Sequence, residues 1–161
     1  MRLTTIVLAM VMVTGTQAQD NRTGDKVMRQ AKGSFAVKVA PVEVSPIGKE
    51  GGVGRMTIDK AISGDMVGTS KGEMLTSITE TTGAMGYVAV ETVTAVLSGR
   101  SGTFVFLHNA TMNKSNPKST SLHITVVPGS GTGGLAGISG SFSIQIDGVG
   151  KHTYTFDYEL P

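Results

Sequence analysis

From residue 31 onward the chain alternates hydrophobic and polar positions over short stretches rich in Val, Ile, Thr, Phe and Tyr, and glycine-rich turns separate these stretches. A period of two is typical of half-buried β-strands, and no convincing amphipathic helix of about ten residues interrupts it. Closing such strands into a barrel removes exposed sheet edges. The pattern therefore predicts an all-β, eight-stranded antiparallel barrel with strands at Gly33 to Ala40, Arg55 to Ile62, Met66 to Thr79, Tyr87 to Ser98, Thr103 to Met112, Thr120 to Val127, Ser139 to Asp147 and Lys151 to Leu160.

The turn at residues 98–102 sets the expected pairing of the fourth and fifth strands. If these five residues form the connection, Leu97 faces Phe104 and Glu91 faces Ala110. One set of side chains then shares a face, and its apolar content identifies that face as the barrel interior. The set consists of Tyr87, Ala89, Glu91, Val93, Leu97, Phe104, Phe106, His108 and Met112.

The last two strands are expected to form a hairpin around residues 148–150. A three-residue loop there brings Ile146 opposite His152 and Phe142 opposite Phe156, so that both strands turn the same kind of residue inward. A two-residue loop would mismatch the faces, and the glycines supply the positive φ that the longer loop needs. We expect Ile144 to face inward with these residues.

The first 18 residues, MRLTTIVLAMVMVTGTQA, have an early cation at Arg2, an apolar run from Ile6 to Val13 and a small residue at Ala18. These are the features of a secretory signal peptide. The apolar run is shorter than the roughly 20 residues of a membrane-spanning helix. We therefore expect an exported protein, periplasmic or secreted, that begins near Gln19 and has no membrane insertion after cleavage.

The remaining chain is expected to hold a polar, disordered lead-in at residues 19–30 and a single barrel domain at residues 31–161. Within the domain, the segment from Pro41 to Gly54 contains two prolines and four glycines and is predicted to be a loop. Two interpretations stay open for this loop, a plain connection and a lid over the barrel mouth.

The amino-acid composition argues against several kinds of binding and catalytic site. The chain has no cysteine, which excludes disulfides, thiolate metal sites and a cysteine nucleophile. The formal charge is only +2, its cations are scattered, and tryptophan is absent, so nucleic-acid binding is not expected. The three histidines are far apart in the sequence, and three inward metal ligands cannot be named, so we predict neither a metal nor a cofactor.

Glu91 and His108 are the candidate catalytic residues, because both are predicted to point inward in a diagonal relation on neighbouring strands. A carboxylate that holds an imidazole is an acid/base unit, but a buried polar pair also fixes barrel register without catalysis, and the second interpretation is the more ordinary one. Lys60 alternates in step with Ile58 and Ile62, which would direct its side chain inward. In that case it would pair with Glu91 or Glu73. A solvated lysine is the preferred interpretation.

Aromatic residues supply further candidates for ligand binding. Tyrosines that line a barrel can donate hydroxyl groups to a ligand, although aromatic core filling with a polar tip is more frequent. The full set of ligand-binding candidates is Tyr87, Glu91, Phe104, Phe106, His108, Tyr154 and Tyr158.

Four glycine-punctuated motifs resemble one bacterial family. They are ISGDMVGTSKGEML at 62–75, GRSGTFVFLH at 99–108, TVVPGSGTGGLAGISG at 125–140 and HTYTFDYEL at 152–160. In order and spacing they are similar to the domain-of-unknown-function family 3224. The resemblance implies an eight-stranded antiparallel barrel of the calycin style, like that of allene oxide cyclase, and it implies no activity and no catalytic residues.

Three hypotheses on function follow. The leading one is an exported barrel that binds a small, mostly apolar ligand in its interior. The second is a cyclase or isomerase resembling allene oxide cyclase, which rests on fold analogy alone. The third is a barrel without a cavity that acts through its surface or as a homo-oligomer.

Overall fold

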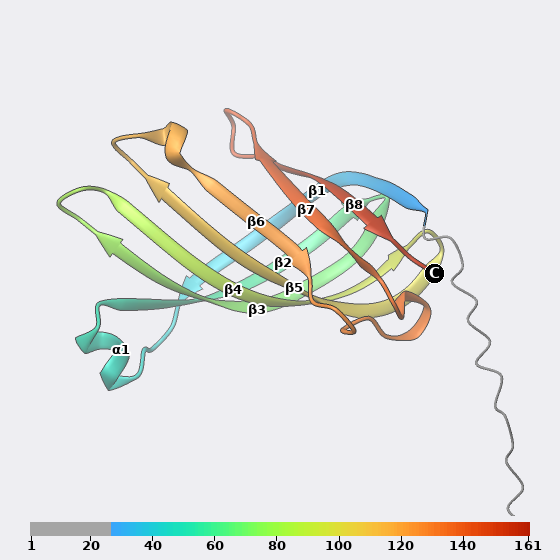
Figure 1. The fold of residues 1–161 in the computed structure, drawn as a ribbon, viewed down its shortest axis with the longest axis horizontal. Helices are drawn as coiled ribbons and strands as arrows, with labels where there is room; N and C mark the ends of the chain where they lie inside the picture. Colours follow the sequence, from blue (N-terminus) through green and yellow to red (C-terminus); the bar gives the residue numbers. More distant parts are fainter. Residues whose placement is uncertain (1–26) are drawn as a thin grey trace, which may run out of the picture.

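The computed structural model describes residues 27–161 and shows a closed antiparallel barrel in which each strand pairs with the next and β8 pairs with β1 (Figure 1). The predicted fold class is therefore confirmed. The elements are β1 (Met28–Pro41), α1 (Pro46–Glu50), β2 (Val53–Gly64), β3 (Met66–Thr79), β4 (Ala84–Leu97), β5 (Arg100–Asn113), η1 (Pro117–Ser119), β6 (Ser121–Val126), η2 (Gly133–Leu135), β7 (Ser139–Ile146) and β8 (His152–Glu159).

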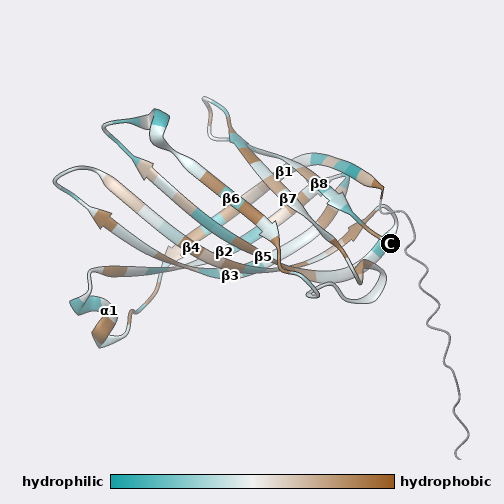
Figure 2. Cartoon of the chain, in the orientation of Figure 1, coloured by the Kyte–Doolittle hydropathy of each residue, from teal (hydrophilic) through white to brown (hydrophobic). Residues whose placement is uncertain are grey.

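The alternation of the sequence appears directly in the burial of the strands. From Val88 to Leu97 in β4, exposed and buried residues alternate without exception, and hydrophobic and hydrophilic bands follow one another along the strands in Figure 2. The residues predicted to face inward from the last hairpin and from β5 are buried or half-buried, with one exception. Ile146 is 63% exposed, because it is the last residue of β7 and lies at the open end of the barrel. The interior therefore forms because alternate side chains leave water together.

The predicted register of β4 and β5 is wrong by four residues, although the predicted face is right. Leu97 pairs with Arg100, and Glu91 pairs with Phe106. The reason is the turn, since Ser98 and Gly99 both have positive φ, at 52° and 74°. Two such residues close a two-residue hairpin whose twist matches that of the strands. A shift of four leaves the side-chain faces unchanged.

The register of the last hairpin is confirmed. Ile146 pairs with His152, Ile144 with Tyr154, and Phe142 with Phe156. Gly150 has a positive φ of 83°, and the Asp147 carboxylate accepts hydrogen bonds from two backbone N–H groups of the loop.

The barrel begins three residues earlier than expected. Met28, Arg29 and Gln30 belong to β1 and pair with β8, and the Gln30 side chain donates a 2.7 Å hydrogen bond to Asp157. Backbone pairing with the last strand orders this polar stretch, which hydrophobic patterning alone could not indicate. The expected signal peptide and most of the expected lead-in lie outside the described residues.

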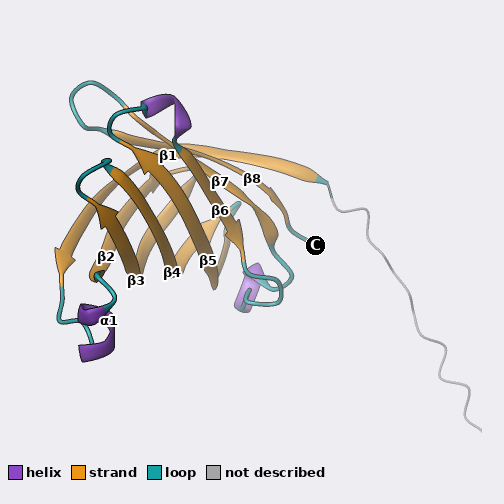
Figure 3. Cartoon of the chain, turned by 60° about the vertical axis from the view of Figure 1, so that its left-hand side comes forward, coloured by secondary structure: helices purple, strands orange, loops and turns teal. Residues whose placement is uncertain are grey.

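The segment from Pro41 to Gly54 is shorter as a loop than predicted. Strands β1 and β2 take its two ends, and the five-residue helix α1 lies between them, capped by the Ser45 side chain. Figure 3 shows the helices at the margins of the strand layer. None of the helices in residues 27–161 is long and apolar enough to cross a membrane.

The two ends of the barrel differ. At the end near the C-terminus, η2 and the residues after it fold inward, and Leu135, Ile138 and Leu160 are buried against the aromatic core. Toward the other end β6 and β7 diverge, and their ladder consists of the single pair Thr125 and Ser141 (Figure 1). The barrel is thus filled at one end and loosely closed along one seam.

Candidate functional site

Four polar or charged residues are buried in the described part of the chain, and they gather in the barrel interior. They are Lys60, Ser70, Glu91 and His108, each at most 6% exposed. The Lys60 ammonium lies 2.7 Å from Glu91 Oε2, and His108 Nε2 lies 3.2 Å from the same oxygen. The Ser70 hydroxyl donates a hydrogen bond to the other carboxylate oxygen, Oε1. We call these four residues the polar cluster.

Small side chains on β3 make this cluster possible. In the register of β2, β3 and β4, Lys60 pairs with Ser70, and Gly72 pairs with Glu91. A Cβ atom on Gly72 would lie 2.7 Å from the Glu91 Cα and 3.0 Å from its Cβ. Because the middle strand carries so little bulk, a lysine on β2 reaches the carboxylate of a glutamate two strands away.

The structure corrects the preferred interpretation of Lys60 as a solvated lysine. Its side chain is 7% exposed, its ammonium lies 4.9 Å from the centre of the Phe35 ring, and its partner is Glu91. Glu73, the other partner considered, instead binds Arg55 on the outer surface. The buried carboxylate attracts the lysine inward because neither charge is stable alone in the interior.

Glu91 is held as an anion. Burial alone raises the pKa of its carboxyl group, but the nearby His108 imidazole, the charge of Lys60 and the hydrogen bonds from Lys60 and Ser70 outweigh it and lower the pKa to about 2. Glu91 thus has three polar neighbours, and its negative charge balances the positive charge of Lys60. The pair is neutral as a whole.

His108 is the incompletely satisfied member of the cluster. The approach of Glu91 and His108 that the sequence predicted is present, since the diagonal relation survives the corrected register. The Nε2 atom, however, is not aligned with the carboxylate oxygen and has no hydrogen-bond partner, although it is buried. A buried polar atom without a partner is uncommon and calls for an explanation.

A cavity of about 430 Å³ lies directly beyond the polar cluster. Lys60 and His108 line it, whereas Glu91 and Ser70 do not and lie behind them. Its other walls are mostly apolar and come from all eight strands, with Tyr87 supplied by β4 and His152 by β8. They include Phe35, Val37, Ile58, Met74, Ala110, Met112, Leu122 and Ile144.

The predicted ligand-binding residues separate into two groups. Tyr87 and His108 line the cavity, and burial followed by the charge of Glu91 raises the pKa of the Tyr87 hydroxyl. Phe104 and Phe106 are packed into the aromatic core. The structure therefore brings only part of the predicted set to the cavity.

Tyr154 and Tyr158 also belong to the core, and their hydroxyl groups have protein partners. The Tyr154 hydroxyl contacts the backbone N–H and carbonyl of Met66 at 3.1 and 3.3 Å, and the Tyr158 hydroxyl lies 2.6 Å from the Ser98 hydroxyl. These hydroxyls fix the packing of β8 rather than pointing at a ligand. Ser70 was not among the predicted site residues, although it lies on the same face of β3 as the buried Met66.

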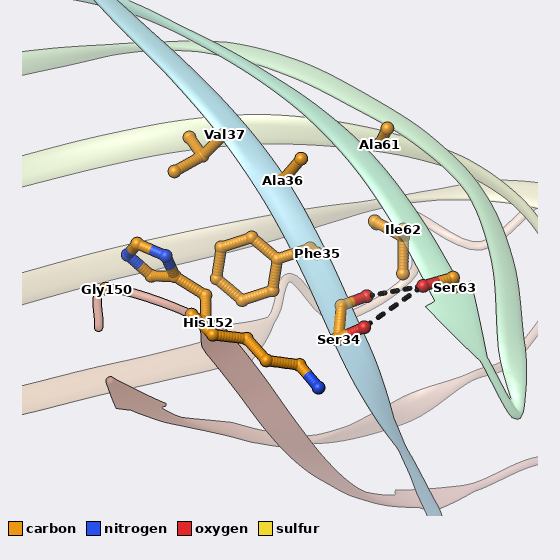
Figure 4. Close-up of a pocket in the computed structure, with 10 residues that line it drawn as sticks. Ser34, Phe35, Ala36, Val37, Ala61, Ile62, Ser63, Gly150 and His152 are labelled. Atoms are coloured by element: carbon orange, nitrogen blue, oxygen red, sulfur yellow. Dashed lines mark hydrogen bonds between the residues drawn. The ribbon is translucent and has the colours of Figure 1, made fainter. Parts of the chain in front are cut away.

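A second hollow of about 630 Å³ lies where β8 begins, beside β1 and β2 (Figure 4). The Phe35 and His152 rings lie next to each other there, with centres 5.0 Å apart. The side chains of Ser34 and Ser63 form a 3.2 Å contact at its edge. Because this hollow contains none of the polar cluster, the interior cavity is the stronger candidate site.

The described residues contain no group of three or more His, Cys, Asp or Glu side chains arranged to hold a metal ion. Of the carboxylates that the structure describes, only Glu91 reaches the interior cluster, and its oxygens are occupied by Lys60 and Ser70.

Comparison with known proteins agrees with the fold. The family model described as "Protein of unknown function (DUF3224)" matches residues 31–158. A solved structure of a protein of unknown function from the DUF3224 family of Shewanella oneidensis MR-1 is 39% identical, with a TM-score of 0.74 over 84% of this chain and 98% of that one. Comparison with curated proteins gives no match.

Proposed function

The chain belongs to the DUF3224 family, and we propose that its barrel binds a small, mostly apolar molecule in the interior cavity. The observation that carries the proposal is a cavity of about 430 Å³ with apolar walls and two buried polar side chains at one end. Small-molecule sites are commonly clefts of about 300–1,000 Å³ in which a few polar groups orient the ligand.

The rim of the cavity supports access for such a ligand. Val39, Leu122 and Ile146 line it and are 45%, 36% and 63% exposed. Apolar side chains at a partly open mouth lose contact with water when an apolar molecule enters, which contributes favourable free energy. The divergence of β6 and β7 beside Leu122 and Ile146 leaves this mouth without a continuous ladder.

The same geometry bears on the two other hypotheses. A cavity of this size disfavours a barrel filled by its own side chains. A cyclase that uses Glu91 gains no support, because Glu91 is occupied by Lys60 and Ser70 and does not line the cavity. Binding is therefore the function that we put forward.

A fluorescence titration tests the proposal. N-phenylnaphthylamine, a neutral apolar dye that brightens away from water, should bind the wild-type protein with saturation. Ala110→Phe should abolish this signal, because Ala110 is 4% exposed and lines the cavity. Thr111→Phe is the matched control, since it places the same ring on the outer face of the same strand.

Circular dichroism must show that both variants keep the wild-type fold. Equal dye binding by wild type and a folded Ala110→Phe protein would refute the cavity as the site. Native mass spectrometry of protein from its own host would then identify a ligand that copurifies.

The proposed location of the protein is the periplasm or the exterior of the cell. It rests on the sequence features of residues 1–18 alone. N-terminal sequencing of the protein from its host should give a mature chain that begins near Gln19. An intact Met1 would show that the segment is not cleaved.

A further inference from the structure

At its polar end, which we call the cavity floor, the cavity is lined by the nitrogen-bearing side chains of Lys60 and His108. The carboxylate of Glu91, their neighbour, does not line the cavity. The Lys60 ammonium has three N–H groups, of which one is directed to Glu91 at 2.7 Å. His108 Nε2 has no hydrogen-bond partner. Both nitrogens lie within 3.2 Å of the same Glu91 oxygen, so they are neighbours at the cavity floor.

The charge of this floor is already balanced. Lys60 and Glu91 form a buried ion pair with side chains 7% and 1% exposed, and among residues 27–161 no aspartate or glutamate lines the cavity. An anionic group placed here would add an uncompensated charge in a poorly solvated space, close to the Glu91 carboxylate. A neutral oxygen would accept a hydrogen bond from the same donors without that cost.

We infer that the cavity floor recognises a neutral hydrogen-bond acceptor, such as a ketone or ester carbonyl, at the head of an otherwise apolar ligand. This inference rests on the proposed function. The carbonyl oxygen accepts from Lys60 and His108, and the apolar remainder lies along Ile58, Met74 and Ile144. Glu91 and Ser70 are positioning residues, because they hold the lysine in place and do not line the cavity.

Three ligands of similar size test the inference: methyl hexyl ketone, octane and octanoate. Their affinities are measured by displacement of N-phenylnaphthylamine from wild type and from the double variant Lys60→Met/Glu91→Gln. This variant replaces the ion pair by uncharged side chains of similar length. Comparing each ligand between the two proteins cancels the differing hydration of the three ligands.

The expected result is a selective loss. The affinity for the ketone should fall on the order of tenfold or more in the double variant, as expected for a hydrogen bond from a charged donor. Octane should bind both proteins within about twofold. Octanoate should lose less affinity than the ketone.

Two results would overturn the inference. Equal losses for ketone and octane would mean that the floor does not recognise a polar head. A larger loss for octanoate would mean that it recognises an anion. If the dye itself fails to bind wild type, the proposed binding function fails instead, and the two failures are therefore distinguishable.

The double variant must be folded for this comparison, which circular dichroism establishes. If it is not, His108→Phe serves in its place, since it removes the unpaired Nε2 atom and leaves the ion pair intact. The ketone should again lose affinity relative to octane, and an unchanged ratio would count against the inference.

Discussion

Breaking the ion pair between Lys60 and Glu91 one partner at a time should be far more costly than removing both. Both side chains are almost completely buried, at 7% and 1% exposure. In Glu91→Gln the lysine loses its 2.7 Å counter-ion in the interior, and in Lys60→Met the carboxylate keeps only Ser70 and the misaligned His108. Each single change should lower the free energy of unfolding by roughly 3–5 kcal/mol.

The double variant should be less damaging than the sum. Lys60→Met/Glu91→Gln leaves no uncompensated charge, and neutral replacements of a buried pair are often close to neutral in stability. We expect the double variant to lose less stability than either single variant, which means that it recovers at least about 3 kcal/mol relative to additive losses. Because a domain of this size is stable by roughly 5–15 kcal/mol, each single variant can remain folded and measurable.

Urea unfolding followed by circular dichroism gives the four free energies of this cycle. A matched surface pair supplies the control, since Lys71 lies 3.1 Å from Asp59 on the outer face of β3 and β2 with side chains 76% and 51% exposed. Lys71→Met should cost less than about 1 kcal/mol. Losses at Lys60 and Glu91 that are equally small, or that simply add, would refute the buried ion pair.

Three further predictions follow from the core and the cluster. The pKa of Glu91 is about 2 in the folded protein against an ordinary 4.5, so its contribution is present above pH 4.5 and lost as pH falls toward 2; urea unfolding should show an acid loss on the order of 3 kcal/mol that Glu91→Gln lacks. Phe106→Ala should cost roughly 3–5 kcal/mol because the ring is 2% exposed, and a loss below about 1 kcal/mol would place the ring outside the core. Gly72→Ala should lower the melting temperature, because its Cβ would lie 2.7 Å from the Glu91 Cα, whereas Gly86→Ala meets no atom nearer than 3.6 Å and should not; equal melting temperatures would contradict the close packing of β3 against β4.

The fold was predictable because its signals are local. Alternation identifies the faces of each strand, and the glycines of the last hairpin identify its loop, so Phe142 and Phe156 could be paired correctly. The turn after Leu97 was mispredicted because Ser98, which is not a glycine, takes a positive φ. An even error in register does not move side chains to the other face, and the interior was therefore predicted despite it.

The seam between β6 and β7 had no comparable signal. Both strands were predicted near their observed bounds, but the segment between them is not a simple hairpin. Val127 and Thr132 donate backbone hydrogen bonds to Val105 and Thr103 of β5, and η2 then folds inward. This excursion draws the chain away from β6 before β7 begins, so only Thr125 and Ser141 pair.

The sequence named Glu91 and Glu73 as possible partners of Lys60, and the choice between them could not be made for a different reason. The inward direction of Lys60 was readable from the pattern, but its choice of Glu91 depends on three strands at once and on the small size of Ser70 and Gly72 between them. The alternation of residues along a strand indicates which face of the sheet a side chain occupies, but it does not indicate which neighbouring strand that side chain contacts. A long side chain opposite a glycine or a serine can interact beyond the neighbouring strand.

The small inward row on β3 also bears on what the polar cluster is for. A buried ion pair generally adds little stability relative to apolar side chains of the same volume. Larger apolar side chains in place of Gly68, Ser70 and Gly72 would therefore fill this space without burying a charge. The chain instead keeps these positions small and seats Lys60 and Glu91 across them. The polar cluster lies between the aromatic core and the cavity, and Lys60 and His108 line the cavity. A role limited to fixing the barrel register does not require this position beside the cavity. The position of the cluster therefore favours ligand recognition, and the affinity of the ketone in Lys60→Met/Glu91→Gln separates the two roles because a purely structural pair would leave that affinity unchanged in a folded protein.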